Sequence, residues 1–325
     1  MIFMRLPSLL ILIFLSVFAS LVCISFGSVS ISWSELFTAL RTGEGVIWDV
    51  LFRLRLPRVV TAFVVGALLS VAGCFIQTLV RNPLADPYIF GVSSGAAIGV
   101  LSAVFFSLTV SQTVLGFIGA GLVMFVVVFL SRRGSDWNPY RLILTGVMVS
   151  AGLNAAISLG LILSPALAMK GMLFWLMGDL TYAEPSLFAV SLLVILVCVS
   201  WFLGTSLDAL TLGRERAITL GVPVITLEYF LYFGAAIATA VVVVDAGAIG
   251  FVGLVVPHIV RLLGGWRYRH LIILSASFGG LLVVFADTLA RTVWAPVQLP
   301  VGVFTALLGV PVLIALLGRQ SNVRA

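Results

Sequence analysis

The sequence predicts an all-α integral membrane protein whose single domain, residues 1–325, contains about ten transmembrane helices. Hydrophobic residues make up 62% of the chain and charged residues only 9%, whereas a soluble globular chain has about 25% charged residues. A spanning helix needs about 20 apolar residues, so this length has room for about ten spans with short connections. The apolar runs lack the period-two alternation of barrel strands, so we expect helices, which satisfy their backbone hydrogen bonds internally.

Ten apolar runs mark the expected spans. They cover residues 6–26, 57–80, 89–108, 112–131, 142–164, 187–204, 226–245, 248–263, 270–289 and 301–318. The eighth run is the least regular, because GAIGFVGLVVPH (247 to 258) is rich in glycine and contains a proline. We therefore expect the start of that span to be a bent or broken helix.

The distribution of basic residues predicts that both termini lie in the cytoplasm. With the N-terminus inside, the inner segments hold 12 of the 18 basic residues and the outer segments hold six. The inner set is Arg5, Arg81, Arg132, Arg133, Arg141, Arg214, Arg216, Arg261, Arg267, Arg269, Arg319 and Arg324. The outer set is Arg41, Arg53, Arg55, Arg58, Lys170 and Arg291. Basic residues gather on the cytoplasmic side of membrane proteins, which favours this orientation.

The segment RLRLPR (53 to 58) is the main exception, because this orientation places its three arginines outside. One interpretation is that they anchor the second span at the lipid headgroups by snorkelling. The other is a docking surface for an acidic patch on an external protein, since guanidinium groups pair with carboxylates through two hydrogen bonds. Arg291 follows Asp287 by one helical turn, so a local ion pair is the alternative for that arginine.

The segment RNPLADP (81 to 87) joins the second and third spans on the inner side. Proline disfavours helix at the residue before it, so Asn82-Pro83 and Asp86-Pro87 predict a tight, non-helical connection. Such a connection is either an ordinary turn or a gate at the inner end of a transport path. In GVSSGAAIG, which follows, Gly91, Gly95 and Gly99 lie about one helical turn apart. They predict a small-residue face for close helix packing, and no strand precedes them, as a nucleotide-binding loop would require.

The longest polar interruption on the inner side is LDALTLGRERAITLGV (207 to 222). Its charged, alanine-containing middle predicts a short helix, punctuated by Gly213 and Gly221. This helix is either an amphipathic connection or a socket for a soluble partner.

The sequence contains no motif for ATP hydrolysis, metal binding, catalysis or nucleic-acid binding. The chain has no GxxxxGK[ST] motif, and its single lysine, Lys170, lies on the outer side. It therefore hydrolyses no ATP through a P-loop, and any ATP drive must come from another polypeptide. The three cysteines lie in apolar runs without metal-ligand spacing, no catalytic constellation stands out, and no basic stripe interleaved with aromatic residues suggests nucleic acid.

Taken together, these motifs resemble the FecCD family of ABC-transporter permeases, which import iron-siderophore complexes, haem and vitamin B12. The resemblance runs from about Val29 to Leu317. The motifs that carry it are LRLPR at 54–58, RNPLADP at 81–87, GVSSGAAIG at 91–99, LGRERAITLGV at 212–222, GAIGFVGLVVPHIVRLL at 247–263, ADTLAR at 286–291 and LPVGVFTALLGVP at 299–311.

The resemblance implies the vitamin B12 permease-like fold of type II ABC importers, with ten helices per subunit. It implies a homodimer with the path on its axis, two ATPase subunits that bind ATP and Mg²⁺, and a periplasmic or lipid-anchored solute-binding protein. The chain itself would bind no cofactor or metal. The expected location is the bacterial cytoplasmic membrane.

The resemblance also implies roles for single residues. Arg55, Arg58 and Arg291 would pair with glutamates of the binding protein, and Arg53 has no firm match. Asn82, Pro83 and Leu84 would help close the inner end of the path. The segment that would couple to the ATPase contains Gly213, Arg214, Glu215, Arg216, Ala217, Leu220 and Gly221. Arg214 departs from the family, which often has an acidic or small residue there, and leaves the partner's local charge pattern open.

Three other functions can be compared with the importer that the resemblance implies. A secondary transporter driven by an ion gradient would need a carboxylate near the bilayer midplane. An intramembrane enzyme would need a buried catalytic pair or a metal cluster. A zinc or manganese permease of the ABC class would lack the combination of motifs found here.

Overall fold

The computed structural model describes residues 6–27, 31, 33–106, 108–131, 139–181, 183–264 and 267–322. Within these ranges the chain is helical and contains no strand, which confirms the predicted all-α membrane fold. The α-helices are α1 (Leu6–Val22), α2 (Trp33–Thr42), α3 (Val46–Asp49), α4 (Leu56–Val80), α5 (Val92–Phe105), α6 (Gln112–Ser131), α7 (Pro139–Leu163), α8 (Ala166–Leu176), α9 (Leu187–Phe202), α10 (Gly204–Thr211), α11 (Arg214–Thr219), α12 (Val224–Ala246), α13 (Val252–Leu262), α14 (Tyr268–Thr292) and α15 (Val301–Asn322). Two 3-10 helices, η1 (Cys23–Ser25) and η3 (Pro87–Phe90), and one π-helix, η2 (Val50–Arg55), complete the set.

Each of the ten predicted spans coincides with an apolar helix. Five helical segments of the described chain are long and apolar enough to cross a membrane, and α9 with α10 makes a sixth if that pair, bent by 72°, is one span. The remaining four predicted spans fall on shorter apolar helices, namely Ile11–Ser25, Val92–Ala103, Val252–Leu262 and Val301–Ala315. Helices α2 and α8 lie in segments that the sequence assigned to connections.

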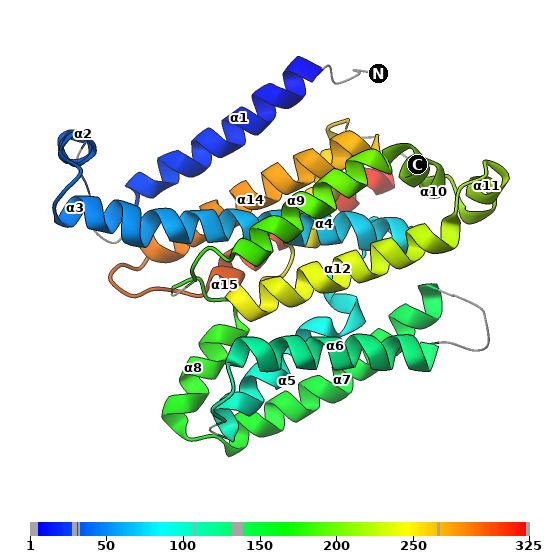
Figure 1. Cartoon of the computed structure of the whole chain (residues 1–325), viewed down its shortest axis with the longest axis horizontal. Helices are drawn as coiled ribbons and strands as arrows, with labels where there is room; N and C mark the ends of the chain where they lie inside the picture. The colour runs from blue at the N-terminus through cyan, green and yellow to red at the C-terminus, as the bar shows by residue number, and fades with distance from the viewer. Residues whose placement is uncertain are drawn as a thin grey trace.

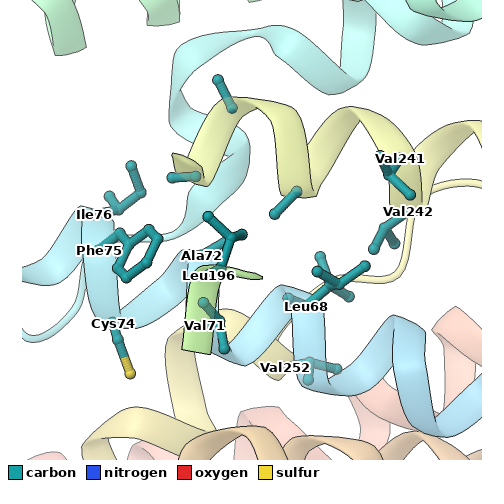
Figure 2. Close-up of a cluster of buried hydrophobic side chains, with 14 of the residues drawn as sticks. Leu68, Val71, Ala72, Cys74, Phe75, Ile76, Leu196, Val241, Val242 and Val252 are labelled. Carbon is teal, nitrogen blue, oxygen red and sulfur yellow. The ribbon is translucent and has the colours of Figure 1, made fainter. Parts of the chain in front are cut away.

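Helix α4 packs most extensively on α14, followed by α12 and α13, and forms the centre of a bundle with these helices. Pro57 stands in its first turn, where the missing N–H costs nothing. The helix ends at Arg81, whose left-handed conformation (φ 54°) lets its N–H reach the carbonyl of Gln77. Figure 2 shows the apolar core that α4 forms with α9, α12 and α13.

Small residues let α4 approach its neighbours closely. A Cβ added at Gly66 would lie 2.7 Å from the carbonyl carbon of Gly279 in α14. One added at Gly253 in α13 would lie 2.7 Å from the carbonyl oxygen of Leu69. Both distances are too short for a side chain, so the helices are in backbone contact, as expected where lipid supplies no hydrophobic driving force.

Helices α5, α6 and α7 form a second group, and α12 packs on both α4 and the α5–α6 pair. In Figure 1 this group lies on the far side of α12 from α4 and α14. The same view shows α10 and α11 at one end of the molecule, hereafter the α11 end, and α2 and α3 at the opposite end. We call the latter the arginine end, because η2 and the last turn of α14 carry Arg55 and Arg291 there.

Helix α1 begins and α15 ends toward the α11 end (Figure 1). This arrangement places both ends of the described chain on the side that carries the polar segment 207–222. Four basic residues counted for the orientation, Arg5, Arg132, Arg133 and Arg324, lie outside the described residues.

The predicted break at the eighth span is present. Helix α12 ends at Ala246, Gly247 has a φ of 70°, and the chain is non-helical until α13 begins at Val252. Phe251, which precedes α13, has a φ of 68°, which is uncommon for a bulky residue. The non-helical residues between α12 and α13 have backbone N–H and C=O groups that are not used within a helix, so other elements can form hydrogen bonds with them.

Candidate functional site

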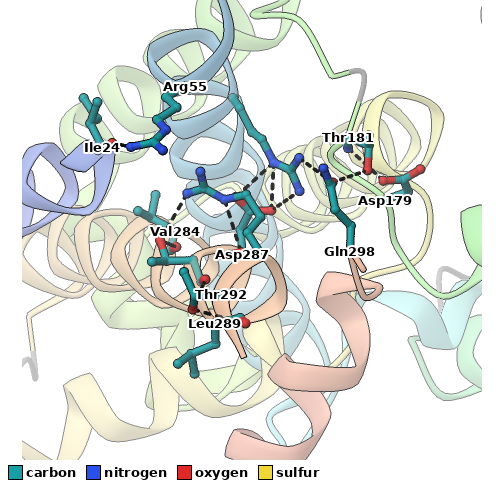
Figure 3. A network of polar contacts seen from close by, with 12 residues as sticks. Ile24, Arg55, Asp179, Thr181, Val284, Asp287, Leu289, Thr292 and Gln298 are labelled. Atoms are coloured by element: carbon teal, nitrogen blue, oxygen red, sulfur yellow. Dashed lines mark hydrogen bonds and ion pairs between the residues drawn. The ribbon is translucent and has the colours of Figure 1, made fainter. Parts of the chain in front are cut away.

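At the arginine end, a buried carboxylate on α14 holds two arginines (Figure 3). The Nε and Nη2 atoms of Arg58 donate to Asp287, with Nη2 2.7 Å from Oδ1. The Nη1 atom of Arg58 donates to Gln298 at 2.9 Å. Arg291, one turn after Asp287, places its Nε 3.0 Å from the second carboxylate oxygen. The Asp287 side chain is only 1% exposed, so the two guanidinium groups supply the charge that its burial requires.

Arg55 belongs to the same cluster but bonds to backbone. Its Nη1 donates to the carbonyls of Ile24 and Ser25 at 3.1 and 3.0 Å, which ties η2 to η1, the 3-10 helix that follows α1. Arg53, by contrast, forms an exposed ion pair with Asp49, its neighbour one turn earlier. The three buried arginines and Asp287 carry a net formal charge of +2.

These arginines line one open cleft of about 510 Å³. Its other lining residues include Arg53, Thr181, Glu184 and Gln298. The structure thus brings Arg55, Arg58 and Arg291, which the resemblance grouped as one docking set, to one cavity from two distant segments. The local ion pair between Arg291 and Asp287 is formed, and the additional link from Asp287 to Arg58 is one that the sequence reasoning missed.

At the α11 end, the connection after α4 is the tight, non-helical turn that the prolines predict. Asn82 and Pro83 are exposed and Leu84 is half-buried. The side chain of Asn82 accepts a hydrogen bond from the N–H of Leu84 at 2.9 Å, which closes the turn. Asp86 then caps η3 by accepting from the N–H of Tyr88 at 2.8 Å. Burial outweighs this bond and raises the pKa of Asp86 to about 6.

The same connection is fastened to the break before α13. The hydroxyl of Tyr88 accepts from the N–H of Ile249 at 3.0 Å and donates to its carbonyl at 3.2 Å. Pro87 also packs on Gly253, since a Cβ there would lie 2.6 Å from the proline ring. Two hydrogen bonds and one close contact therefore join η3 to the break and to the start of α13.

A buried glutamine compensates for the proline inside α13. Pro257 has no N–H, so the carbonyl of Gly253, four residues earlier, loses its helical partner. The Nε2 atom of Gln77 on α4 donates to Gly253 and Leu254 at 3.3 and 3.1 Å. Arg261 donates in turn to the Oε1 atom of Gln77, so the whole amide group is engaged.

The three glycines of GVSSGAAIG have different surroundings. Gly91 has a φ of 75° and ends η3. A Cβ at Gly95 would lie 2.6 Å from the carbonyl oxygen of Gly119 in α6, and one at Gly99 would lie 3.0 Å from Gly116 Cα. Gly95 and Gly99 therefore lie at the α5–α6 contact. Gly91 ends a turn and also lies close to α7, because a Cβ there would be 3.2 Å from the carbonyl oxygen of Gly146.

The polar segment 207–222 forms two short helices, α10 and α11, separated by Gly213 at a φ of 122° and followed by Gly221 at 76°. Asp208 accepts from the N–H of Tyr268 at 2.7 Å and so holds the start of α14. Ala217 is buried, whereas the outer surface of the segment is exposed. The exposed residues are Thr211, Leu212, Glu215, Arg216, Ile218, Thr219, Leu220 and Gly221. Charged and apolar side chains together make this surface suited to a protein partner.

Arg214, the residue that departs from the family pattern, points inward. Its Nε lies 3.4 Å from Oε1 of Glu228, a carboxylate on α12 that is 2% exposed. Sequence reasoning missed Glu228, although a charge in the third position of the predicted span 226–245 was a visible signal. Among the described residues, no group of three His, Cys, Asp or Glu side chains could hold a metal ion.

Comparison with known proteins gives one consistent result. The family model described as the FecCD transport family matches residues 10–319. The haemin transport system permease protein HmuU of Yersinia pestis is 38% identical over 97% of this chain and 96% of its own length. The vitamin B12 import system permease protein BtuC of Vibrio parahaemolyticus is 36% identical over 85% of this chain and 84% of its own.

A solved structure supports the same assignment. It is described as a metal-chelate type ABC transporter in an inward-facing conformation, and it matches 95% of this chain and 97% of its own with a TM-score of 0.81 and 28% identity. The fold, the order of the motifs and the family match agree along nearly the whole length. The chain belongs to the FecCD transport family of ABC-transporter permeases.

Proposed function

We propose that this chain is the membrane-spanning permease subunit of an ATP-binding-cassette importer. The observation that carries the proposal is the full-length likeness to permeases of such importers. The proposed solute is a bulky metal chelate, either an iron complex of a siderophore or haem, or cobalamin. The proposed location is the bacterial cytoplasmic membrane, with both termini and the α11 end facing the cytoplasm.

The proposed active form is a homodimer with the path between the two copies. Helix α7 supports this arrangement, because most of its side chains are exposed in the single chain. Its exposed residues include Gly152, Asn154 and Ser158, and Asn154 accepts a hydrogen bond from Ser94 of α5 at 3.0 Å. Polar and small residues on a membrane helix face another helix or an aqueous path, not lipid. A second copy against α7 would give these groups such a surface.

An external solute-binding protein, periplasmic or lipid-anchored, is proposed to dock at the arginine end. The cluster of Arg55, Arg58 and Arg291 carries a net positive charge beside an open cleft. Asp287 and Gln298 hold Arg58 in one orientation, so little side-chain entropy is lost when a partner carboxylate binds. Glutamates of the binding protein are the expected partners.

The α11 end is proposed to bind the ATPase subunits, which bind and hydrolyse ATP with Mg²⁺. The exposed surface of α11, with Gly213 and Gly221 at its ends, is the proposed contact. Asn82, Pro83 and Leu84 are proposed to help close the path at this end. Nucleotide drives transport only if it stabilises one of the outward- and inward-facing states more than the other, so the ATPase must bind differently to the two.

Transport into proteoliposomes tests the proposal. The chain is reconstituted with its ATPase partner, ATP is enclosed, and the binding protein is supplied with radiolabelled cobalamin, haem or ferric siderophore. We expect uptake of one solute that requires ATP and is unchanged by a protonophore. Uptake abolished by the protonophore at constant ATP would instead establish a secondary transporter.

A further inference from the structure

The ion pair between Arg214 and Glu228 bridges the turn that joins α11 to α12. Arg214 is the first residue of α11 and Glu228 lies in the second turn of α12. Between the helices, Gly221 has a φ of 76° and Pro223 precedes α12. The pair, at 3.4 Å, thus fixes the direction of α11 relative to α12 across a connection that contains a glycine.

Arg214 and, more weakly, Arg81 are the two positive charges that act on Glu228. Its carboxylate is almost fully buried, and its second oxygen, Oε2, has no hydrogen-bond partner among the described residues. A buried carboxylate is costly unless a positive charge accompanies it. Arg214 remains 41% exposed, so its charged group lies between solvent and the buried carboxylate.

The helices that the pair joins also contact the rest of the permease. Helix α11 packs mainly on α10 and α12, and α12 packs in turn on α4, α5 and α6. Helix α10 is fixed separately to the start of α14 through Asp208 and the N–H of Tyr268. A force on α11 therefore reaches the rest of the permease by two routes, one through α10 to α14 and one through α12 to both helix groups. The side-chain link on the second route is Arg214–Glu228.

We infer that Arg214 and Glu228 are positioning residues that transmit movement of the ATPase-facing helix α11 to α12. This inference rests on the proposed function. It also reassigns the unusual Arg214: its charge is directed inward to Glu228, so an ATPase partner meets Glu215 and Arg216 on the outer surface of α11.

A charge-swap cycle tests the inference. The variants are Arg214→Glu, Glu228→Arg and the double exchange, with the exposed Arg41→Glu on the remote helix α2 as the control. The measurements are ATP hydrolysed per solute imported and the amount of ATPase retained on purification. We expect each single reversal to raise the ATP-to-solute ratio about fivefold, the effect of a contact worth roughly 1 kcal/mol. Both variants should retain the ATPase, and the double exchange should restore the ratio.

A conservative variant and the wild-type chain serve as further comparisons. If a reversed variant fails to fold, Glu228→Gln removes the charge while keeping the shape, and it should raise the ratio in the same direction. Single variants that couple like the wild type, or a double exchange no better than the singles, would overturn the inference. A wild-type chain that retains no ATPase would overturn the proposed function instead, so the two failures are distinguishable.

Discussion

Asp287 and Arg58 are 229 positions apart in the sequence, yet their side chains meet in a buried ion pair at 2.7 Å. The pair joins the first turn of α4 to the last turns of α14, the two helices with the most extensive mutual packing. Asp287 also binds Arg291, so one carboxylate orders two of the three arginines at the proposed docking surface. If the proposed docking surface is correct, the stability of the fold and the docking of the binding protein both depend on Asp287.

Replacing Asp287 with asparagine should destabilise the protein strongly. The change leaves two buried guanidinium groups without their counter-charge, and breaking a buried pair costs about 3–5 kcal/mol. The thermal unfolding midpoint in detergent would fall markedly. Asp49→Asn, which removes the exposed pair with Arg53, is the matched control and should cost less than about 1 kcal/mol. Equal midpoints for the two variants would show that the buried network contributes little.

Charge reversal of Arg55, Arg58 and Arg291 together should weaken docking of the binding protein. Removing charge-assisted pairs costs affinity, and the remaining affinity should depend less on salt. Arg58 and Arg291 also stabilise Asp287, so a folded, monodisperse preparation is required before affinity is measured. Arg41→Glu, a reversal on exposed α2, provides the control. Unchanged affinity at low salt in a folded triple variant would exclude this docking surface.

Substitution of Gly95 by leucine should destabilise the α5–α6 contact. The Cβ alone would overlap the backbone of Gly119, and forcing extra atoms into a packed contact typically costs 1–3 kcal/mol. Gly121→Leu on α6 is the control, because a Cβ there meets nothing within 4 Å. The measurement is the difference between the two unfolding midpoints. A Gly95→Leu protein as stable and active as the control would refute the close-packing interpretation.

The connection containing Asp86 should be more stable in acid. Burial raises the pKa of Asp86 to about 6, so the folded state favours the protonated carboxyl. Its stabilising contribution is fully present below the ordinary value of about 4 and is lost as the pH rises through about 6. Asp86→Asn keeps an oxygen acceptor for the N–H of Tyr88 but cannot ionise. Between pH 4 and 7, proteolytic nicking of this connection should therefore increase in the wild type relative to the variant. Parallel profiles would contradict the assignment.

The spans were predictable because the bilayer imposes a length and a composition on every helix that crosses it. Runs such as 112–131 and 270–289 therefore fall on helices α6 and α14. Helix α8 escaped prediction, since its 11 residues are too few for a span and Lys170 interrupts them. The break before α13 was visible because glycines and a proline disfavour a regular helix at that place.

The side-chain contacts were less accessible to sequence reasoning. The pairing of Arg291 with Asp287 follows from helical periodicity, whereas that of Arg58 with Asp287 requires knowing that α4 lies on α14. Arg214 and Glu228 are close in the sequence, but they lie on different helices separated by a turn. Helical spacing therefore does not predict that they form a pair. Likewise, the amide of Gln77 binds the carbonyl freed by Pro257 only because α13 packs on α4.

The central claim is tested most directly by ATPase activity of the chain co-purified with its ATPase partner in lipid nanodiscs. The binding protein is added after loading in turn with cobalamin, haem and a ferric siderophore. We predict that one loaded form stimulates hydrolysis above the level with the empty binding protein, which would also identify the solute. A chain that binds no ATPase subunit, yet moves solute down an ion gradient, would contradict it.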